Sequence, residues 1–208
     1  MKKTKIGISS YSYSYAVGFP GFTPPSPLDA FGLVDKAAEL EVPVLQIGDN
    51  CPLDGLGQER LAALGDYAKR RGISIEVGTR GIKTDNLLRY IQIAAALHAP
   101  LLRVVLDTKD SRPDFDEIIQ LLRCVLPELE KTDIVLGIEN HDRFPARVFA
   151  QIVKTLDHPN VGIVLDTVNS FACEETTWQV VDELAKYTVN FHVKDFKIQR
   201  VENSMGCW

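Results

Sequence analysis

Three residues with metal-ligand chemistry follow three consecutive apolar runs in the second half of the chain. Glu139 stands in the segment GIEN, Asp166 in VLDT and His192 in FHVKD. If these runs are neighbouring parallel strands, their carboxyl ends lie at one edge, and two carboxylates and an imidazole converge there. Such a group in a partly dry cavity needs a compensating cation, and its ligand types suit Mn²⁺, Mg²⁺, Co²⁺ or Zn²⁺. The sequence therefore predicts a divalent-metal site.

Each of these residues, taken alone, also has an ordinary structural explanation. Glu139 and Asp166 could cap the helices that follow them, and His192 could be a hydrogen-bonded core histidine. The joint occurrence at the ends of three successive strands favours the metal site over these explanations.

The elements that must position these residues are short β-branched apolar runs that recur about every 30 residues, as βαβ units require. We expect seven strands, at Lys5–Ser9, Val44–Ile47, Ser74–Val77, Leu101–Leu106, Ile134–Glu139, Gly162–Asp166 and Val189–Val193. Segments of helical spacing lie between them, and the expected helices are Leu28–Leu40, Gln58–Arg71, Asp85–Leu97, Asp114–Glu130, Pro145–Leu156 and Thr176–Tyr187.

This alternation predicts an α/β fold with a parallel sheet, and a (β/α)8 barrel is favoured over an open doubly wound sheet. The open sheet is disfavoured because no glycine-rich dinucleotide motif follows the first strand, where SSYSY stands instead. No low-complexity linker interrupts the chain, and the Pro/Gly-rich stretch Gly18–Pro27 is interpreted as a long loop. We therefore expect residues 1–208 to form a single domain.

The segments GIEN, VGIVLDT and FHVKDF resemble the fifth, sixth and seventh strands of the xylose-isomerase-like TIM-barrel superfamily. This resemblance implies a sugar or sugar-phosphate isomerase or epimerase that works through an enediolate. It also implies a divalent metal held by a Glu, an Asp, a His and a second Glu from strands five to eight. The first three correspond to Glu139, Asp166 and His192, and Glu139 would also serve as the catalytic base.

The resemblance gives no counterpart for the fourth ligand. Sixteen residues follow His192, too few for a crossover helix and another strand. We therefore expect an incomplete barrel that lacks strand eight, ending in the loop after strand seven. The strands at its two edges would then be exposed and would invite self-association into a homo-oligomer.

Five further residues near the strand ends are candidate substrate contacts. Lys194 would neutralise a developing oxyanion or bind a hydroxyl, and Arg200 follows in the next loop. Asn169 stands where several members of the resembled family carry a substrate-contacting histidine, and His141 is near the site in sequence. Glu76 is either a further contact or the partner of Arg80 in a structural ion pair.

Composition narrows the range of partners. The chain has 208 residues, 45% of them hydrophobic, and a formal net charge of -5 with mixed signs, so neither nucleic acid nor an anionic membrane is expected as a partner. No apolar stretch approaches the roughly 18 residues of a membrane span. The four cysteines lack metal-binding or disulfide-scaffold spacing, and a reducing cytoplasm is expected. The predicted partner is a small sugar or sugar phosphate.

Three alternatives to an isomerase or epimerase stay open. An inosose-type dehydratase would use the same enediolate chemistry but expel a hydroxyl. An endonuclease IV-type phosphodiesterase would need more His and Glu ligands and a basic face, which the four histidines and the acidic balance disfavour. A catalytically impaired chain with only a binding role is the third.

Overall fold

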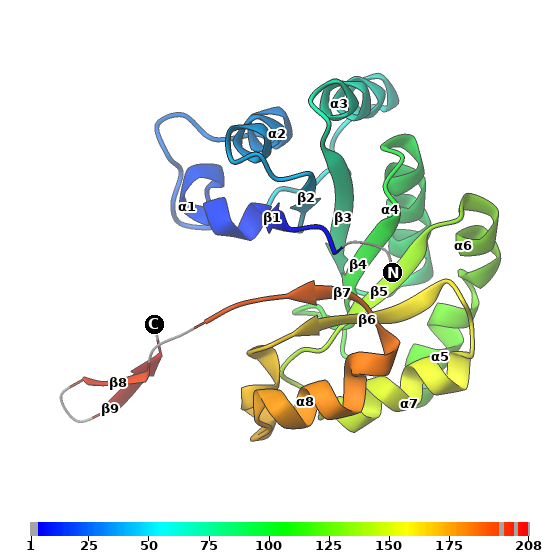
Figure 1. Ribbon diagram of the computed structural model, residues 1–208. Coiled ribbons are helices and arrows are strands. Elements are labelled where there is room, and N and C mark those ends of the chain that lie inside the picture. Colours follow the sequence, from blue (N-terminus) through cyan, green and yellow to red (C-terminus); the bar gives the residue numbers. More distant parts are fainter. Residues whose placement is uncertain (1–3, 196–197, 202–203, 208) are drawn as a thin grey trace. The chain divides into compact units, whose positions relative to one another are not determined.

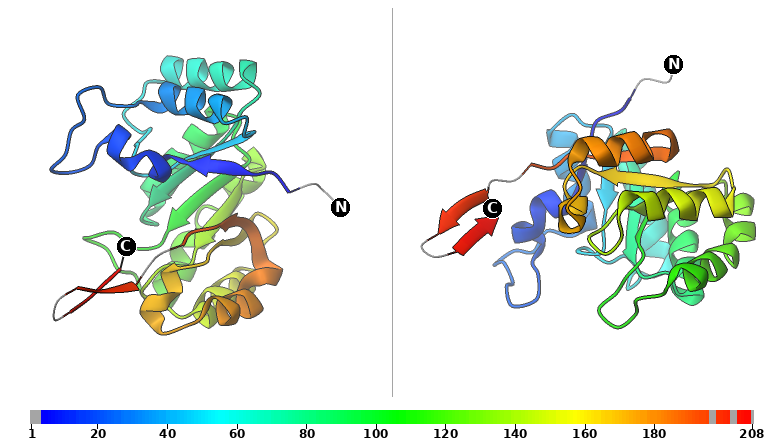
Figure 2. Two further views of the ribbon diagram at one scale, coloured as in Figure 1. Left: turned by 60° about the vertical axis from the view of Figure 1, so that its left-hand side comes forward. Right: turned by 90° about the horizontal axis from the view of Figure 1, so that it is seen from below.

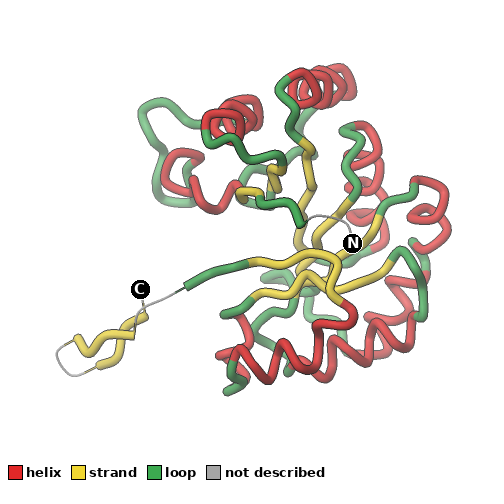
Figure 3. The backbone as a smooth tube through the Cα atoms, viewed as in Figure 1, coloured by secondary structure: helices red, strands yellow, loops and turns green. Residues whose placement is uncertain are grey.

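The computed structural model describes residues 4–195, 198–201 and 204–207, the last two ranges without their side chains. The chain divides between Leu136 and Gly137 into two compact units, and each is described by itself. Figure 3 shows how strands and helices alternate along the backbone. That residues 1–208 form a single domain stays a prediction.

Parallel strands in chain order are the frame of the molecule (Figure 1). The pairs β1–β2, β2–β3, β3–β4 and β6–β7 are each parallel. All seven predicted strands are present, with ends shifted by a few residues: β1 (Gly7–Ser9), β2 (Val44–Ile47), β3 (Ser74–Arg80), β4 (Leu101–Val105), β5 (Val135–Glu139), β6 (Val161–Asp166) and β7 (Thr188–His192).

Helices connect the strands of each unit and pack against them (Figure 2). In the first unit α2 contacts β2, and α4 contacts β3 and β4; in the second unit both α7 and α8 contact β6. The α-helices are α1 (Ser14–Val17), α2 (Ala30–Glu39), α3 (Gln58–Arg70), α4 (Thr84–Ala96), α5 (Phe115–Arg123), α6 (Leu126–Thr132), α7 (Ala146–Leu156) and α8 (Thr177–Leu184), and the short 3-10 helices are η1 (Ser10–Tyr13), η2 (Asn169–Cys173) and η3 (Ala185–Tyr187). Within the described ranges, no helix combines the length and the apolar character that a bilayer span requires.

The predicted helix Asp114–Glu130 is wrong as a single element, because it is divided into α5 and α6. Pro127 lies in the first turn of α6. Proline has no backbone N–H to continue the helical ladder, and its ring clashes with the carbonyl four residues earlier, so the helix restarts there. The start of α5 is fixed by a capping box between Asp114 and Glu117.

The predicted loop at the end of the chain is also corrected. Ile198–Val201 (β8) and Ser204–Cys207 (β9) are strands that pair with each other in antiparallel fashion. The sequence analysis expected no strands after His192.

The strands differ in burial: β4 and β6 are buried, whereas β7, the edge strand of the second unit, is partly exposed. Every residue of β4 and of β6 is buried. In β7 the side chains of Val189 and Phe191 are exposed, and Val193 just beyond the strand is exposed as well. The core strand β6 therefore gives its terminal residue, Asp166, a rigid support.

Candidate metal centre

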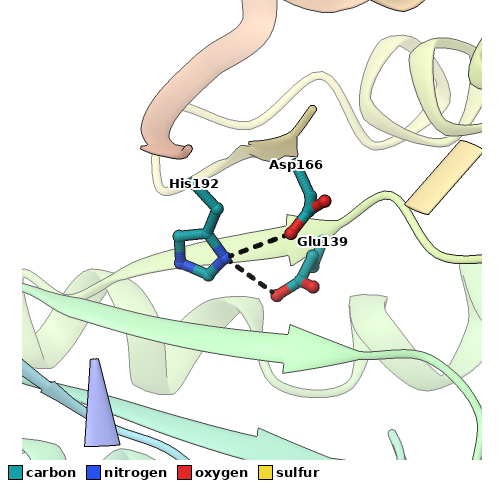
Figure 4. Close-up of side chains that lie close together, drawn as sticks. All are labelled: Glu139, Asp166 and His192. Atoms are coloured by element: carbon teal, nitrogen blue, oxygen red, sulfur yellow. Dashed lines mark ion pairs between the residues drawn. The ribbon is translucent and has the colours of Figure 1, made fainter. Parts of the chain in front are cut away.

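Glu139, Asp166 and His192 are each the last residue of a strand, at the ends of β5, β6 and β7. Asp166 and His192 are register partners in the β6–β7 pair. All three belong to the second unit, and Figure 4 shows their side chains pointing toward one another. The strand ends thus bring together the three residues that the sequence singled out as ligands.

The distances between these side chains are those of donors that can share one ion. His192 Nδ1 lies 3.3 Å from Glu139 Oε2 and 3.9 Å from Asp166 Oδ2 (Figure 4). One ligand atom from each residue lies within 4.8 Å of the other two. Two donors bound to one cation at about 2.1 Å are separated by about 3 Å at right angles and by about 4.2 Å on opposite sides. The two distances from His192 Nδ1 fall in this range.

Asp166 is oriented by the backbone that follows it. Its Oδ1 atom accepts hydrogen bonds from Val168 N at 2.9 Å and from Asn169 N at 3.1 Å, where η2 begins. Because these two N–H groups hold Oδ1, the other oxygen, Oδ2, faces His192. Asp166 is 0% exposed, so its charge is buried with only one oxygen engaged by the backbone.

Asn169 links Glu139 to the same turn. Its Nδ2 atom donates to Glu139 Oε1 at 2.8 Å and to Asn140 O at 3.0 Å. Glu139 is 2% exposed, and with Oε1 held by the amide its Oε2 is the oxygen nearest His192. Asn169, predicted as a substrate contact, is therefore placed so that it orients Glu139.

Asn140 supports the centre from within the core, and the sequence analysis missed it. Its Oδ1 accepts from Asp166 N at 2.7 Å, and its Nδ2 donates to Asp166 O and Ser170 Oγ, both at 3.0 Å. The residue is fully buried, so these bonds satisfy polar groups that water does not reach. The polar residue directly after a ligand at a strand end was the available signal.

Lys194 lies beside the two carboxylates. Its ammonium Nζ forms an ion pair with Asp166 Oδ2 at 2.7 Å and donates to Asn169 Oδ1 at 3.0 Å. The Thr167 hydroxyl accepts from Lys194 N and donates to Lys194 O, both at 3.1 Å, which holds the lysine backbone against the end of β6. The positive charge of Lys194 thus lies in contact with Asp166, one of the predicted ligands.

The residues present fit a divalent cation. His192 Nε2 is buried and has no hydrogen-bond partner in the part of the chain that the structure describes, and the buried Asp166 Oδ2 is contacted by the Lys194 ammonium. Two buried carboxylates a few ångströms from one imidazole concentrate negative charge, which a bound cation would offset. The donor set of two carboxylate oxygens and one imidazole nitrogen suits Mn²⁺, Mg²⁺, Co²⁺ and Zn²⁺.

No described contact joins the other three predicted substrate contacts to the three clustered side chains, and their role stays a prediction. His141 Nδ1 contacts the carboxylate of Asp142. The backbone of Arg200 is in β8, and its side chain lies outside the described residues. Glu76 is in the first unit, where its Oε2 accepts a hydrogen bond from Gln46 Nε2 at 3.0 Å.

A second charged cluster ends the strands of the first unit. Asp49 Oδ1 pairs with Arg103 Nη1 at 3.0 Å, and Asp49 Oδ2 pairs with Arg80 Nε at 3.4 Å. Arg80 is thus paired with Asp49, and a pair of Arg80 with Glu76 stays a prediction. Partial burial of its ring, together with the nearby Asp49 carboxylate, raises the pKa of Tyr11 to about 12, although the residue remains 45% exposed. A side chain at Gly48 would lie 2.8 Å from the Tyr11 ring, so the glycine lets the ring approach.

Comparison with known proteins shows which family the chain resembles. A family model described as xylose isomerase-like TIM barrel matches residues 35–205. The 3-oxo-isoapionate decarboxylase of Pectobacterium atrosepticum is 35% identical over 201 residues, which cover 97% of this chain and 72% of that protein.

Solved structures of low sequence identity share the fold. D-psicose 3-epimerase from Clostridium cellulolyticum H10 is 19% identical with a TM-score of 0.74, over 91% of this chain and 72% of that chain. The probable 3-DHS dehydratase AsbF from Bacillus anthracis is 13% identical with a TM-score of 0.67, over 96% of this chain and 76% of that chain. These matches confirm the predicted fold class, an α/β TIM barrel of which seven strands are present. The chain therefore belongs to the xylose isomerase-like TIM barrel family.

Proposed function

We propose that the chain binds a divalent cation through Glu139, Asp166 and His192 and catalyses a reaction of a keto sugar or keto sugar acid that passes through an enediolate or enolate. The observation that supports this proposal is the convergence of three ligand atoms within 4.8 Å at the ends of β5, β6 and β7. A cation held there supplies electrophilic stabilisation of negative charge that develops on substrate oxygens.

The chain's own residues then divide the remaining tasks. Glu139 contributes Oε2 to the ligand set, and its position beside His192 also suits proton transfer at a substrate carbon. Asn169 holds Glu139 Oε1 at 2.8 Å and so fixes the direction of the carboxylate. Lys194, half exposed, adds positive charge where substrate oxygens would lie.

Decarboxylation of a 3-oxo sugar acid is the reaction class that we favour. It is supported by the 35% identity to the 3-oxo-isoapionate decarboxylase, which extends over 97% of this chain. In such a reaction the bond between the carboxylate carbon and its neighbour breaks, CO₂ leaves, and the electron pair moves to the 3-oxo oxygen. Protonation of the carbon then gives the ketone. Only the enolate oxygen needs stabilisation, so no base has to remove a proton from carbon.

Isomerisation or epimerisation of a ketose is the second candidate. It is supported by the buried Glu139 carboxylate, 3.3 Å from His192, which would act as both ligand and base, and the similar fold of a D-psicose 3-epimerase agrees with it. Dehydration, the reaction class of the similarly folded probable dehydratase, is a third outcome of the same enolate chemistry. A small sugar-derived substrate, a cytoplasmic location and self-association through sheet edges stay predictions.

One experiment distinguishes the candidates. The metal-stripped chain is supplied with Mn²⁺ and incubated separately with 3-oxo-isoapionate and with D-psicose, while CO₂ release and the proton spectrum of the sugar are followed. We expect CO₂ from the acid. A new epimer or a hydrogen exchanged with solvent in the ketose would support isomerisation instead.

Two variants control this experiment. Glu139→Gln removes a proposed ligand charge at constant size and should abolish turnover. Lys154→Met changes an exposed lysine on α7 that lies 5.9 Å from the Tyr187 ring and should leave turnover unchanged. Turnover that persists in Glu139→Gln, or no Mn²⁺-dependent turnover in the unaltered chain, would refute the proposal.

A further inference from the structure

Lys194 touches the one oxygen of Asp166 that the backbone leaves available. Two backbone N–H groups hold Oδ1, at 2.9 and 3.1 Å, so Oδ2 is the oxygen that a cation would take. This is also the oxygen that lies 3.9 Å from His192 Nδ1. The lysine ammonium already lies 2.7 Å from it. A chain-borne cation and an incoming cation would therefore share one atom.

Lys194 is also connected to the second carboxylate. Its Nζ donates to Asn169 Oδ1 at 3.0 Å, and Asn169 Nδ2 donates to Glu139 Oε1 at 2.8 Å. The Lys194 backbone is held by the Thr167 hydroxyl through two hydrogen bonds of 3.1 Å. The side chain is 47% exposed, so its ammonium can leave Asp166 and be solvated by water. The lysine is thus anchored at its backbone, while its half-exposed ammonium can reach water.

The charge balance of the cluster changes when a divalent cation arrives. Without it, the negative charges of Glu139 and Asp166 are both buried, and the Lys194 ammonium offsets part of that charge. With a divalent cation bound, the two carboxylates are already neutralised, and the ammonium becomes an excess positive charge a few ångströms from another cation. The same contact that stabilises the metal-free centre then opposes metal binding.

We propose that Lys194 stands in for the divalent cation at Asp166 in the metal-free protein and that the ammonium must leave Oδ2 when the cation binds. This inference rests on the proposed metal site. It makes Lys194 a residue that lowers metal affinity and keeps the empty centre folded. Once displaced, the ammonium is available to an anionic group of the substrate, which couples metal loading to substrate binding.

The test is the affinity of the metal-stripped chain for Mn²⁺, measured by calorimetry in the unaltered protein and in Lys194→Met. Methionine keeps most of the length of the side chain and removes its charge. We expect Mn²⁺ to bind about tenfold more tightly to the variant, because the competing charge is absent. The melting temperature of the metal-free variant should fall, and the increase on adding Mn²⁺ should be larger than in the unaltered chain.

Lys154→Met serves as the matched control, because it removes an exposed lysine of the same unit outside the ligand set and should leave the Mn²⁺ affinity unchanged. Lys194→Gln keeps a hydrogen-bond donor without the charge. If charge competition is the cause, Gln must bind Mn²⁺ as tightly as Met, and this variant also serves if Lys194→Met does not fold without metal.

Weaker or unchanged Mn²⁺ binding in both Lys194 variants, beside normal binding to the unaltered chain, would overturn this inference and leave the metal site standing. An absence of Mn²⁺ binding from the unaltered chain and from both variants would overturn the metal site together with it. A crystal structure with Mn²⁺ bound that kept Lys194 Nζ within hydrogen-bond distance of Asp166 Oδ2 would also contradict the displacement.

Discussion

Charged residues end the strands of both units, but the two clusters obtain their positive charge differently. In the first unit, one carboxylate, Asp49, pairs with two guanidinium groups, those of Arg80 and Arg103. In the second unit, two buried carboxylates, Glu139 and Asp166, lie beside one imidazole, with the half-exposed Lys194 paired to Asp166. The first cluster contains two cationic groups for its carboxylate Asp49, whereas the second has two buried carboxylates and an imidazole nitrogen, His192 Nε2, without a hydrogen-bond partner among the described residues.

This difference separates a structural cluster from a candidate functional one. Arginine stays charged and forms directional pairs, so the Asp49 cluster is complete within the chain. Buried charged or polar groups that the surrounding residues do not satisfy destabilise the fold. A protein keeps such groups where a bound ligand offsets the destabilisation. Charged residues at the strand ends of a barrel therefore indicate a binding site where the chain does not neutralise their charge, and a structural role where it does.

The largest expected effect is on stability, from Asn140, the uncharged residue whose hydrogen bonds support the second cluster. Asn140→Ala removes the partner of Asp166 N, Asp166 O and Ser170 Oγ, all in a fully buried position. We expect the free energy of unfolding to fall by about 3 kcal/mol, because several buried polar groups lose their bonds. Urea denaturation of the metal-free chain measures this. A loss under about 1 kcal/mol would mean that ion pairs, not these bonds, hold the centre.

The next largest effect concerns the first cluster. Asp49→Asn keeps the size of the side chain but removes the carboxylate that pairs with the buried Arg103 and with Arg80. We expect a destabilisation of about 2 kcal/mol in the same urea experiment, since the buried guanidinium of Arg103 loses a charged partner. If the variant were as stable as the unaltered chain, the cluster would not be the structural element that the comparison makes it.

Glu139→Gln should behave in the opposite way. Removing one of two neighbouring buried carboxylates relieves repulsion, so the metal-free variant should be as stable as the unaltered chain, within about 0.5 kcal/mol, or more stable. The stabilisation by Mn²⁺, however, should disappear. A thermal melt with and without Mn²⁺ measures both. A destabilisation as large as that of Asp49→Asn would remove the distinction between the clusters.

The smallest effect is on the ionisation of Tyr11. Burial and Asp49 raise its pKa to about 12, above the ordinary value of 10, so the fold favours the protonated phenol. The stability from this preference is fully present below pH 10 and is lost as the pH rises through 12. Asp49→Asn should lower the pKa of Tyr11, which an ultraviolet titration read against Tyr11→Phe can detect. An unchanged pKa would mean that burial alone causes the shift.

Much of the fold follows from the sequence, because parallel strands buried on both faces are short apolar runs at regular spacing. The seven strands were predicted in this way. The division of the helix at α5 and α6 depends on the single proline Pro127, and the pairing of β8 with β9 has no periodic apolar run to mark it. These two features therefore differ from the prediction.

The convergence of Glu139, Asp166 and His192 was predictable because each is the last residue of its strand, so strand order alone brings the three together. The contacts around it were not predictable. The ion pair of Lys194 with Asp166 and the link from Asn169 to Glu139 depend on side-chain directions at the start of η2. Spacing along the chain does not encode such directions.

The most direct test of the central claim is a calorimetric titration of the metal-stripped chain with Mn²⁺, beside His192→Ala. His98→Asn is the matched control, because it changes an exposed histidine of the first unit, and asparagine tolerates the positive φ of 53° at that position. The account predicts one saturable site in the unaltered chain and in the control, and a loss of about 100-fold or more in His192→Ala. A folded chain that binds no Mn²⁺, or equal affinity in His192→Ala, would contradict it.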